Sequence, residues 1–426
     1  MLVLGIDIGT SGVRSAVLDD SGHLVSQARA AHVDQSADRI DAEGWWTAVR
    51  HCLAAQMAAM REAGLEPTDI RAAAVDGTSG SMVLVDEESR PVTRALMYNA
   101  SGFAAEAEQI ARHAPASHIT LGSNSALARL LRLQSEDREG AARMLCHQAD
   151  FILAKLTGVL GLSDQNNALK TGYDPEAETW PSWFEAAGVR SALLPIVVPA
   201  GAEAAPIAPN VASDFGLPSN LMLHAGTTDS VAAFLATGAS KPGMAVSSLG
   251  TTLAIKLLSP MRIDDPSIGL YSHKVADMWL AGGASNSGGG VLRDFFDPDA
   301  LTALSARIDP DCDSGLDYYP LSRPGERFPI NDPHLQPRLS PRPDNDVRFL
   351  HGLFQGIARI EAQGYRALAE RGASPPDYVY SVGGGARNET WRRIRERELG
   401  VPVRIAAHDE ASIGAAKLCQ LGVGSQ

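Results

Sequence analysis

Cysteine is scarce in this chain, which has only four among its 426 residues: Cys52, Cys146, Cys312 and Cys419. They lie far apart, without a Cys-x-x-Cys pair and without a histidine at metal-ligand spacing. This excludes a disulfide scaffold and gives no sign of a structural zinc site. We expect reduced thiols, as in a cytosolic protein.

Long apolar runs and an excess of basic residues are also absent. No run reaches about 18 apolar residues, so we expect no transmembrane helix. The N-terminus lacks a basic region ahead of an apolar stretch, so we expect no signal peptide and a soluble, cytoplasmic protein. The 37 basic residues are outnumbered by 50 acidic ones, giving a net charge of -13. Nucleic acid and anionic membranes are therefore not expected as partners.

What the sequence does contain is a strand, a Gly-Thr-Ser/Thr turn and a second strand, twice, at 4–18 and 246–258. The two copies are separated by about 240 residues, which is too long a period for a solenoid. The repeat predicts an α/β fold of two similar domains, with a cleft between them. We place the domains at 1–220 and 221–426, with the Pro-rich stretch 195–218 as the connector.

The first copy, "GIDIGTSGVR", has an aspartate inside an apolar strand. The amides of the following turn, from Gly9 to Gly12, form the kind of concave surface that binds phosphate oxygens. Asp7 would then face a metal–nucleotide complex or a sugar hydroxyl. The alternative is an ordinary glycine-rich hairpin in which Asp7 bonds to its own turn. The second copy, "SLGTTLAIK", favours the phosphate interpretation, because two such turns can bind one polyphosphate.

In "AGTTDSVAAFLATG", Asp229 stands where a strand gives way to a helix. A carboxylate at such a position is a candidate general base. Thr228 or Asp229 as a simple helix cap is the equal alternative. Two polar loops, "AVDGTSGSM" and "LSDQNNALKTGYD", are either solvated turns or carriers of sugar-binding groups.

"SVGGGARNETW" combines three glycines with Asn388 and Trp391. Glycines let a flat ring approach the backbone, Asn388 has groups that match an adenine edge, and Trp391 offers a surface for stacking. The alternative is a turn with Asn388 or Thr390 as a helix cap and Trp391 in the core.

Taken together and in order, these stretches resemble the FGGY family of carbohydrate kinases, within the actin-like ATPase superfamily. The strings are "GIDIGTSGVRSAVLD", "SDQNNALKTGYD", "AGTTDSVAAFLATG", "SSLGTTLAIK" and "VGGGARNETW". The resemblance implies two actin-like, ribonuclease H-like domains, each a mixed sheet flanked by helices, with a catalytic cleft between them. The N-terminal domain would bind the sugar and the C-terminal domain the nucleotide.

The resemblance also implies roles for individual residues. Asp229 matches the family's catalytic base, and Asp7 matches the carboxylate near the transferred phosphoryl group and its Mg²⁺, the one metal contact expected. ATP is the expected phosphoryl donor. The phosphate-loop and adenosine positions are Thr10, Ser11, Gly12, Thr251, Thr252, Gly384, Gly385 and Asn388. The expected sugar contacts are Asp7, Asp76, Thr78, Ser79, Asp164 and Asp229.

This sequence departs from the family pattern in two places. "DGTSGS" stands where Gln-Met-His-Gly is usual, and "MYNASGF" lacks the Asp and Arg of Trp-x-Asp-x-Arg. The chain looks like a compact cyanobacterial and plant subgroup similar to D-ribulose kinase, which implies D-ribulose as the acceptor and D-ribulose 5-phosphate as the product. D-xylulose kinase, a non-sugar actin-like ATPase and an inactive binding protein are the alternatives. A monomer or a homodimer is expected.

Overall fold

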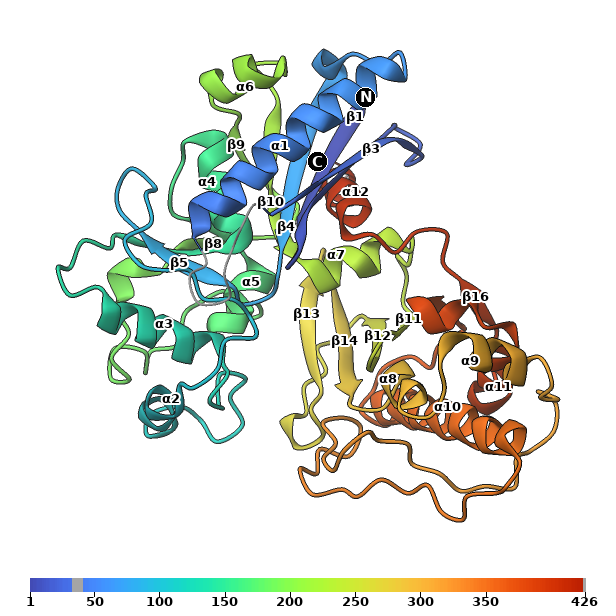
Figure 1. Ribbon diagram of the computed structural model, residues 1–426. Helices are drawn as coiled ribbons and strands as arrows, with labels where there is room; N and C mark the ends of the chain where they lie inside the picture. The colour runs from blue at the N-terminus through green and yellow to red at the C-terminus, as the bar shows by residue number, and fades with distance from the viewer. Residues whose placement is uncertain (33–40, 424–426) are drawn as a thin grey trace. The chain divides into compact units, whose positions relative to one another are not determined.

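The computed structural model describes residues 1–32 and 41–423, and the chain divides into two compact units (Figure 1). The first unit comprises Met1–Ala236 and Glu410–Gln426, and the second comprises Thr237–Asp409. No helix within the described residues is long and apolar enough to span a bilayer.

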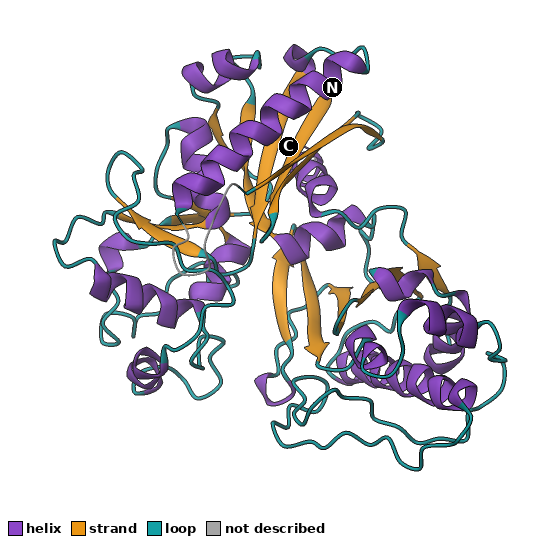
Figure 2. Cartoon of the chain, in the orientation of Figure 1, coloured by secondary structure: helices purple, strands orange, loops and turns teal. Residues whose placement is uncertain are grey.

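The first unit contains both strands and helices, which Figure 2 distinguishes by colour. Its strands are β1 (Leu2–Ile8), β2 (Gly12–Leu18), β3 (Leu24–Ala31), β4 (Ile70–Gly77), β5 (Met82–Val85), β6 (Met144–His147), β7 (Leu162–Asp164), β8 (Ile196–Val198), β9 (Glu203–Pro206) and β10 (Met222–Thr228). Its helices are α1 (Ala42–Glu62), α2 (Ala104–Ala111), α3 (Ala126–Glu136), α4 (Gln148–Thr157), α5 (Gln165–Thr171), α6 (Pro209–Phe215), α7 (Asp229–Ala236) and α12 (Ala411–Val423).

The second unit is built in the same way around a second sheet. Its strands are β11 (Met244–Leu249), β12 (Leu253–Ser259), β13 (Tyr271–Val275), β14 (Met278–Ser285), β15 (Tyr378–Val382) and β16 (Val403–Ile405). Its α-helices are α8 (Gly289–Arg293), α9 (Pro298–Ser305), α10 (Asp346–Glu370) and α11 (Glu389–Leu399). The segment 311–345, which precedes α10, contains no helix or strand.

The two main sheets share a core of five strands, and each has a sixth strand on a different edge, β9 beside β10 and β13 beside β14. Their strand orders are β3-β2-β1-β4-β10-β9 and β13-β14-β12-β11-β15-β16. In each, a hairpin (β1–β2 or β11–β12) is antiparallel, and its first strand pairs in parallel with a later strand, β4 or β15. The structure therefore confirms the internal repeat and the fold of two mixed sheets flanked by helices.

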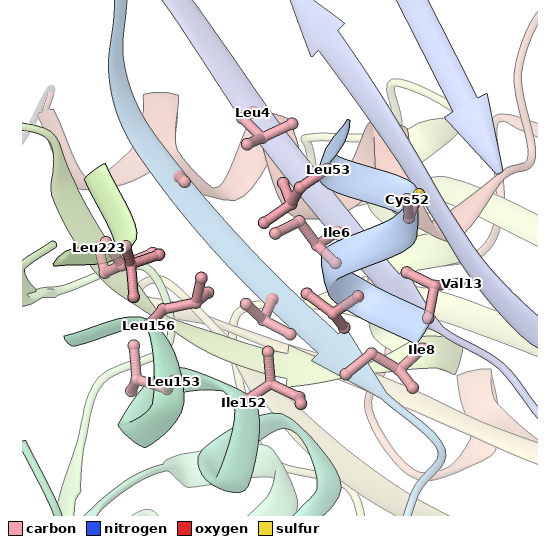
Figure 3. Packing of buried hydrophobic residues seen from close by; sticks show 14 of the residues in the cluster. Leu4, Ile6, Ile8, Val13, Cys52, Leu53, Ile152, Leu153, Leu156 and Leu223 are labelled. Carbon is pink, nitrogen blue, oxygen red and sulfur yellow. The ribbon is translucent and has the colours of Figure 1, made fainter. Parts of the chain in front are cut away.

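Strand β1 is buried along its whole length because helices cover both faces of its sheet. Leu4, Ile6 and Ile8 belong to a core with α1 and α4 (Figure 3), whereas Val3 packs with α12 on the other face. A parallel strand covered on both faces reads as a continuous apolar run, so a charged side chain in it is conspicuous. Gly5 is required here, because a Cβ atom would lie 1.9 Å from the backbone oxygen of Ser412 in α12.

The compact units do not follow the boundary expected at residues 220 and 221. Strand β10 pairs with β4 and continues into α7, so the first unit extends to Ala236. Helix α12 packs against α7 and β1, which returns the C-terminus to the first unit. The stretch 195–218 is likewise no simple connector, since it forms β8, β9 and α6, and β9 pairs with β10.

Candidate active site

Carboxylates gather at one edge of the first sheet. Asp7 lies near the carboxyl end of β1, Asp76 near that of β4, and Asp229 directly follows β10. These three strands are parallel neighbours, so their carboxyl ends meet at the same edge. In open α/β sheets this edge is where ligands bind.

Asp7 is almost fully buried, with 4% of its surface exposed. It stands opposite Asp76 on one side and Arg14 on the other, and Nη1 of Arg14 donates to its Oδ2 over 3.4 Å. Burial raises the pKa of Asp7, while Asp76 and the positive charge of Arg14 act in the opposite direction. Asp7 therefore bonds to neighbouring strands and not to the amides of its own turn.

Asp76 is fully buried, and no described residue donates a hydrogen bond to either of its oxygens. Burial raises its pKa well above the usual range, and the negative charges of Asp7, Asp229 and Asp164 raise it further. An unpartnered buried carboxylate is costly, so the group is neutral instead. A proton on Asp76 also removes its repulsion with Asp7, which stands opposite it on β1.

Asp229 is the first residue of α7 and is half-buried. Its Oδ1 accepts a hydrogen bond of 2.7 Å from the backbone N–H of Ser230. The strand-to-helix switch expected around this residue is present, with β10 ending at Thr228. Strand β10 pairs in parallel with β4, so Asp229 and Asp76 lie at the same edge of the sheet, and the charge of Asp229 helps to raise the pKa of Asp76.

Asp164 serves as the N-cap of α5. Its Oδ1 accepts hydrogen bonds from the backbone of Asn166 and Asn167 over 2.8 and 3.0 Å, and its Oδ2 accepts from Nδ2 of Asn167 over 2.7 Å. With both oxygens engaged and the residue buried, the structure accounts for Asp164 as a helix cap.

The loop after β4 is held by a residue that sequence reasoning missed. Oε1 of Gln148, at the start of α4, accepts from the backbone N–H and the hydroxyl of Thr78 over 2.9 and 2.7 Å. The Thr78 hydroxyl also lies 2.6 Å from that of Ser81. Ser79 is half-buried, and its hydroxyl has no described partner. Thr78 thus forms its hydrogen bonds within the protein, whereas the hydroxyl of Ser79 has no partner among the described residues.

The turn after β1 exposes Thr10 and Ser11. It is closed by a hydrogen bond of 2.9 Å from the N–H of Gly9 to the carbonyl of Gly12. A Cβ atom on Gly12 would lie 2.3 Å from the backbone oxygen of Ala30, so only glycine fits. The close packing of β3 against the turn explains why residue 12, within "GIDIGTSGVR", is a glycine.

The corresponding turn of the second unit follows β11 and exposes Gly250 and Thr251. The N–H groups of Gly289 and Gly290 donate to the carbonyls of Gly250 and Thr251, each over 2.9 Å. Nη2 of Arg293 donates to Oγ1 of Thr251 over 2.8 Å. Gly289 and Gly290 belong to the glycine-rich stretch "GGASNSGGG", and the sequence gives no signal for its contact with this turn.

The third glycine loop joins β15 to α11. Gly384 is exposed, and a Cβ atom there would meet nothing within 4 Å. Gly385 is restricted, since its Cβ would lie 2.7 Å from the Trp391 ring. Trp391 itself is buried and stacked on Phe354, with ring centroids 4.8 Å apart and an interplanar angle of 7°. Trp391 therefore belongs to the core, as the alternative interpretation held.

Asn388 is the N-cap of α11, and its Oδ1 accepts from the backbone N–H of Trp391 over 2.9 Å. Its Nδ2 donates to the hydroxyl of Ser305 over 3.0 Å. Both ends of the side chain are engaged inside the protein. The structure thus accounts for Asn388 as a helix cap, and one N–H of its amide lies beyond these two contacts.

No group of three or more His, Cys, Asp or Glu side chains within residues 1–32 and 41–423 could hold a metal ion. Magnesium bound with a nucleotide keeps phosphate and water ligands and needs only one or two carboxylates. Asp7, a single carboxylate beside a phosphate-type turn, fits that requirement.

Comparison with known proteins identifies the family. The model of the FGGY family of carbohydrate kinases matches residues 2–236 with its N-terminal domain and residues 245–422 with its C-terminal domain. The chain is 27% identical to a xylulose kinase of Streptomyces coelicolor over 97% of this chain and 86% of the relative. It is 25% identical to a gluconokinase of Bacillus subtilis, over 99% and 87%.

The fold matches solved structures over the whole chain. The xylulose kinase of Rhodospirillum rubrum superposes with a TM-score of 0.86 at 22% identity, covering 100% of this chain and 91% of that one. Glycerol kinase of Plasmodium falciparum gives 0.84 at 14% identity, covering 100% and 90%. Because both family domains match in order and span the two sheets with their glycine turns, this chain belongs to the FGGY family of carbohydrate kinases.

Proposed function

We propose that this protein transfers the γ-phosphoryl group of ATP to the terminal hydroxyl of a ketopentose. One observation carries the proposal: Asp229 stands at the strand-to-helix switch after β10, at the sheet edge where the buried Asp7 and Asp76 also lie. Phosphoryl transfer requires alignment and charge stabilisation, with a carboxylate to accept the hydroxyl proton. We assign the sugar to the first unit and the nucleotide to the second.

In this mechanism Asp229 accepts the proton of the attacking hydroxyl. Asp229 is half-buried, and one of its two oxygens accepts from the Ser230 amide, an orientation that supports a fixed base. Asp7 is held between Arg14 and Asp76, so its carboxylate is fixed before substrate arrives. The unused hydroxyl of Ser79 is the sugar contact that the geometry supports best.

ATP would bring Mg²⁺, whose charge offsets that of the phosphates, with Asp7 as its protein contact. The exposed turns Gly9–Gly12 and Gly250–Thr252 offer backbone amides of the type that bind phosphate. Gly384 leaves open space for an adenosine ring. Trp391 and Asn388 are left out of this assignment, because their contacts lie within the protein.

D-ribulose is the acceptor that we propose, giving D-ribulose 5-phosphate. The supporting feature is "DGTSGS" in place of Gln-Met-His-Gly, which brings short polar side chains to the loop after β4. D-xylulose is the second candidate, and the names of several relatives favour it at least as well. The two sugars differ at one hydroxyl, and a site that bonds one orientation rejects the other.

The deciding experiment compares kcat/KM for D-ribulose, D-xylulose, L-ribulose and glycerol with purified protein, by coupled ADP release. A tenfold preference for D-xylulose, about 1.4 kcal/mol of transition-state binding, would replace the ribulose assignment and keep the kinase. Rapid ATP hydrolysis that no sugar stimulates would support a non-sugar ATPase instead.

A further inference from the structure

The side chain of Arg293 contacts the exposed turn between β11 and β12. Arg293 is the last residue of α8, and its Nη2 donates to the hydroxyl of Thr251 over 2.8 Å. Both residues are exposed, and no carboxylate among the described residues forms an ion pair with this guanidinium. Of the five N–H donors in a guanidinium, this contact uses one.

Some exposed arginines of this unit are neutralised by an acid. Arg338 pairs with Asp317 over 2.9 Å, and Arg393 pairs with Asp311 over 2.7 Å. Arg293 has no such pair in the described part of the chain, and its side chain bonds to the hydroxyl of Thr251. Its positive charge remains available to an anion at the Gly250–Thr252 turn.

The position of Arg293 relative to the turn is fixed by the backbone as well. Gly289 and Gly290 donate to the turn's carbonyls, and a Cβ atom on either would lie 2.8 Å from the oxygen it bonds. The first turn of α8 and the Gly250–Thr252 turn therefore form one bonded element. The N–H groups of Thr251 and Thr252 bond to no acceptor in the described part of the chain, so they are open to a ligand.

Comparison of the two hairpins shows why the guanidinium beside the second turn belongs to Arg293 in α8 and not to a hairpin strand. In the first sheet Val13 pairs with Ile8 at the hairpin end, and the next residue of that strand is Arg14. In the second sheet Leu253 pairs with Leu249, and the next residue is Ala254. The position that carries Arg14 in the first hairpin thus carries an uncharged Ala254 in the second, and Arg293 reaches the turn from α8.

We propose that Arg293 binds the phosphate groups of the nucleotide at the Gly250–Thr252 turn. Guanidinium pairs with phosphate through charge-assisted, often bidentate hydrogen bonds. The amides of the turn and the guanidinium would bind the same anion. This inference rests on the proposed function, in which the second unit binds ATP.

The test measures binding of ATP, ADP and adenosine to the full chain by calorimetry without sugar. Arg293→Gln should weaken ATP and ADP binding about tenfold and leave adenosine binding unchanged, since only the phosphates lose a partner. Arg293→Lys should bind ATP and ADP with an affinity between those of the wild type and Arg293→Gln, because lysine keeps the charge and loses the planar fork of N–H donors. Arg366→Gln, at an exposed arginine of α10 in the same unit, is the matched control and should bind ATP like the wild type.

Unchanged ATP affinity in Arg293→Gln overturns the assignment of Arg293 and leaves the proposed kinase standing. Equal weakening of ATP and adenosine also overturns it, because that pattern reports a disturbed loop. Thr251→Val provides a second check, since it removes the hydroxyl that holds Arg293 and should weaken ATP binding by a smaller factor. A wild-type chain that binds neither ATP nor ADP overturns this inference and the proposed function together.

Discussion

Asp7 and Asp76 stand opposite each other in the parallel pairing of β1 and β4, both buried, with Arg14 bonded to Asp7 alone. Two adjacent buried carboxylates cannot both be ionised at low cost, so the pair holds a proton. Asp76, which has no described donor, is the member that carries it. Arg14 orients Asp7 from one side, and the raised pKa of Asp76 makes the stability of the fold depend on pH.

Replacing Asp76 with Asn should flatten the pH dependence of stability. The pKa of Asp76 is raised by burial and neighbouring acids, whereas an unfolded aspartate titrates at about 4. Above that pH the folded chain keeps a proton that the unfolded chain has lost, so stability falls as pH rises. We expect the Tm of the wild type to fall more steeply than that of Asp76→Asn between pH 5 and 9. Parallel Tm curves would contradict a raised pKa at Asp76.

Asp229→Asn should fold like the wild type, because the two side chains are nearly isosteric. Its sugar-dependent turnover should fall by roughly 100-fold or more, since a positioned base contributes about 10² to 10⁴. ATP binding should persist. The assay is coupled ADP release, and Asp20→Asn, at an exposed loop aspartate of the same unit, is the control. Near-normal turnover in Asp229→Asn would mean that this residue only orders the start of α7.

Ser79→Ala should raise the KM for the sugar by about 2- to 12-fold, which corresponds to one lost hydrogen bond of about 0.5–1.5 kcal/mol. The KM for ATP should stay constant, because Ser79 belongs to the loop after β4 in the first unit. Thr78→Ser is the matched control, since it keeps the hydroxyl that donates a hydrogen bond to Gln148. Equal changes in both KM values would instead indicate a general disturbance of the loop.

Asn388→Ala should destabilise the protein by about 1 kcal/mol, the usual cost of a lost helix cap. Asn388→Asp retains a capping oxygen and should recover most of that stability. Urea unfolding measures both variants, and we expect Asn388→Asp to keep a normal KM for ATP. A raised KM for ATP in a stable Asn388→Asp protein would restore the adenosine contact implied by the family resemblance.

Removing one partner of the buried ion pair in the second unit should greatly lower the free energy of unfolding. Nε of Arg395 lies 2.7 Å from Oε2 of Glu361, and both side chains are buried. Arg395→Met would leave a buried carboxylate unpaired, at a cost of about 3–5 kcal/mol. Urea unfolding should show this loss, and Arg366→Gln on the exposed face of α10 should not. A small effect from Arg395→Met would mean that Glu361 takes up a proton.

The sequence by itself determined the internal repeat, the glycine turns and the candidate base. Each is local: a strand ending in Gly-Thr-Ser or Gly-Thr-Thr has its turn chemistry written in adjacent residues, and Asp229 lies where an apolar strand gives way to an apolar helix. These features depend on neighbouring residues and not on how distant parts of the chain pack. The same is true of the family motifs, which depend on residue type and order.

The tertiary structure alone decided the extent of the units and the partners of individual side chains. Pairing of β10 (Met222–Thr228) with β4 (Ile70–Gly77), and packing of α12 (Ala411–Val423) on β1 (Leu2–Ile8), join segments far apart in the sequence, so no local pattern predicts them. Asn388 bonds to Ser305, and Arg293 bonds to Thr251, across similarly unconnected stretches. A side chain's role depends on which donors and acceptors surround it, and that is fixed only when distant elements pack together.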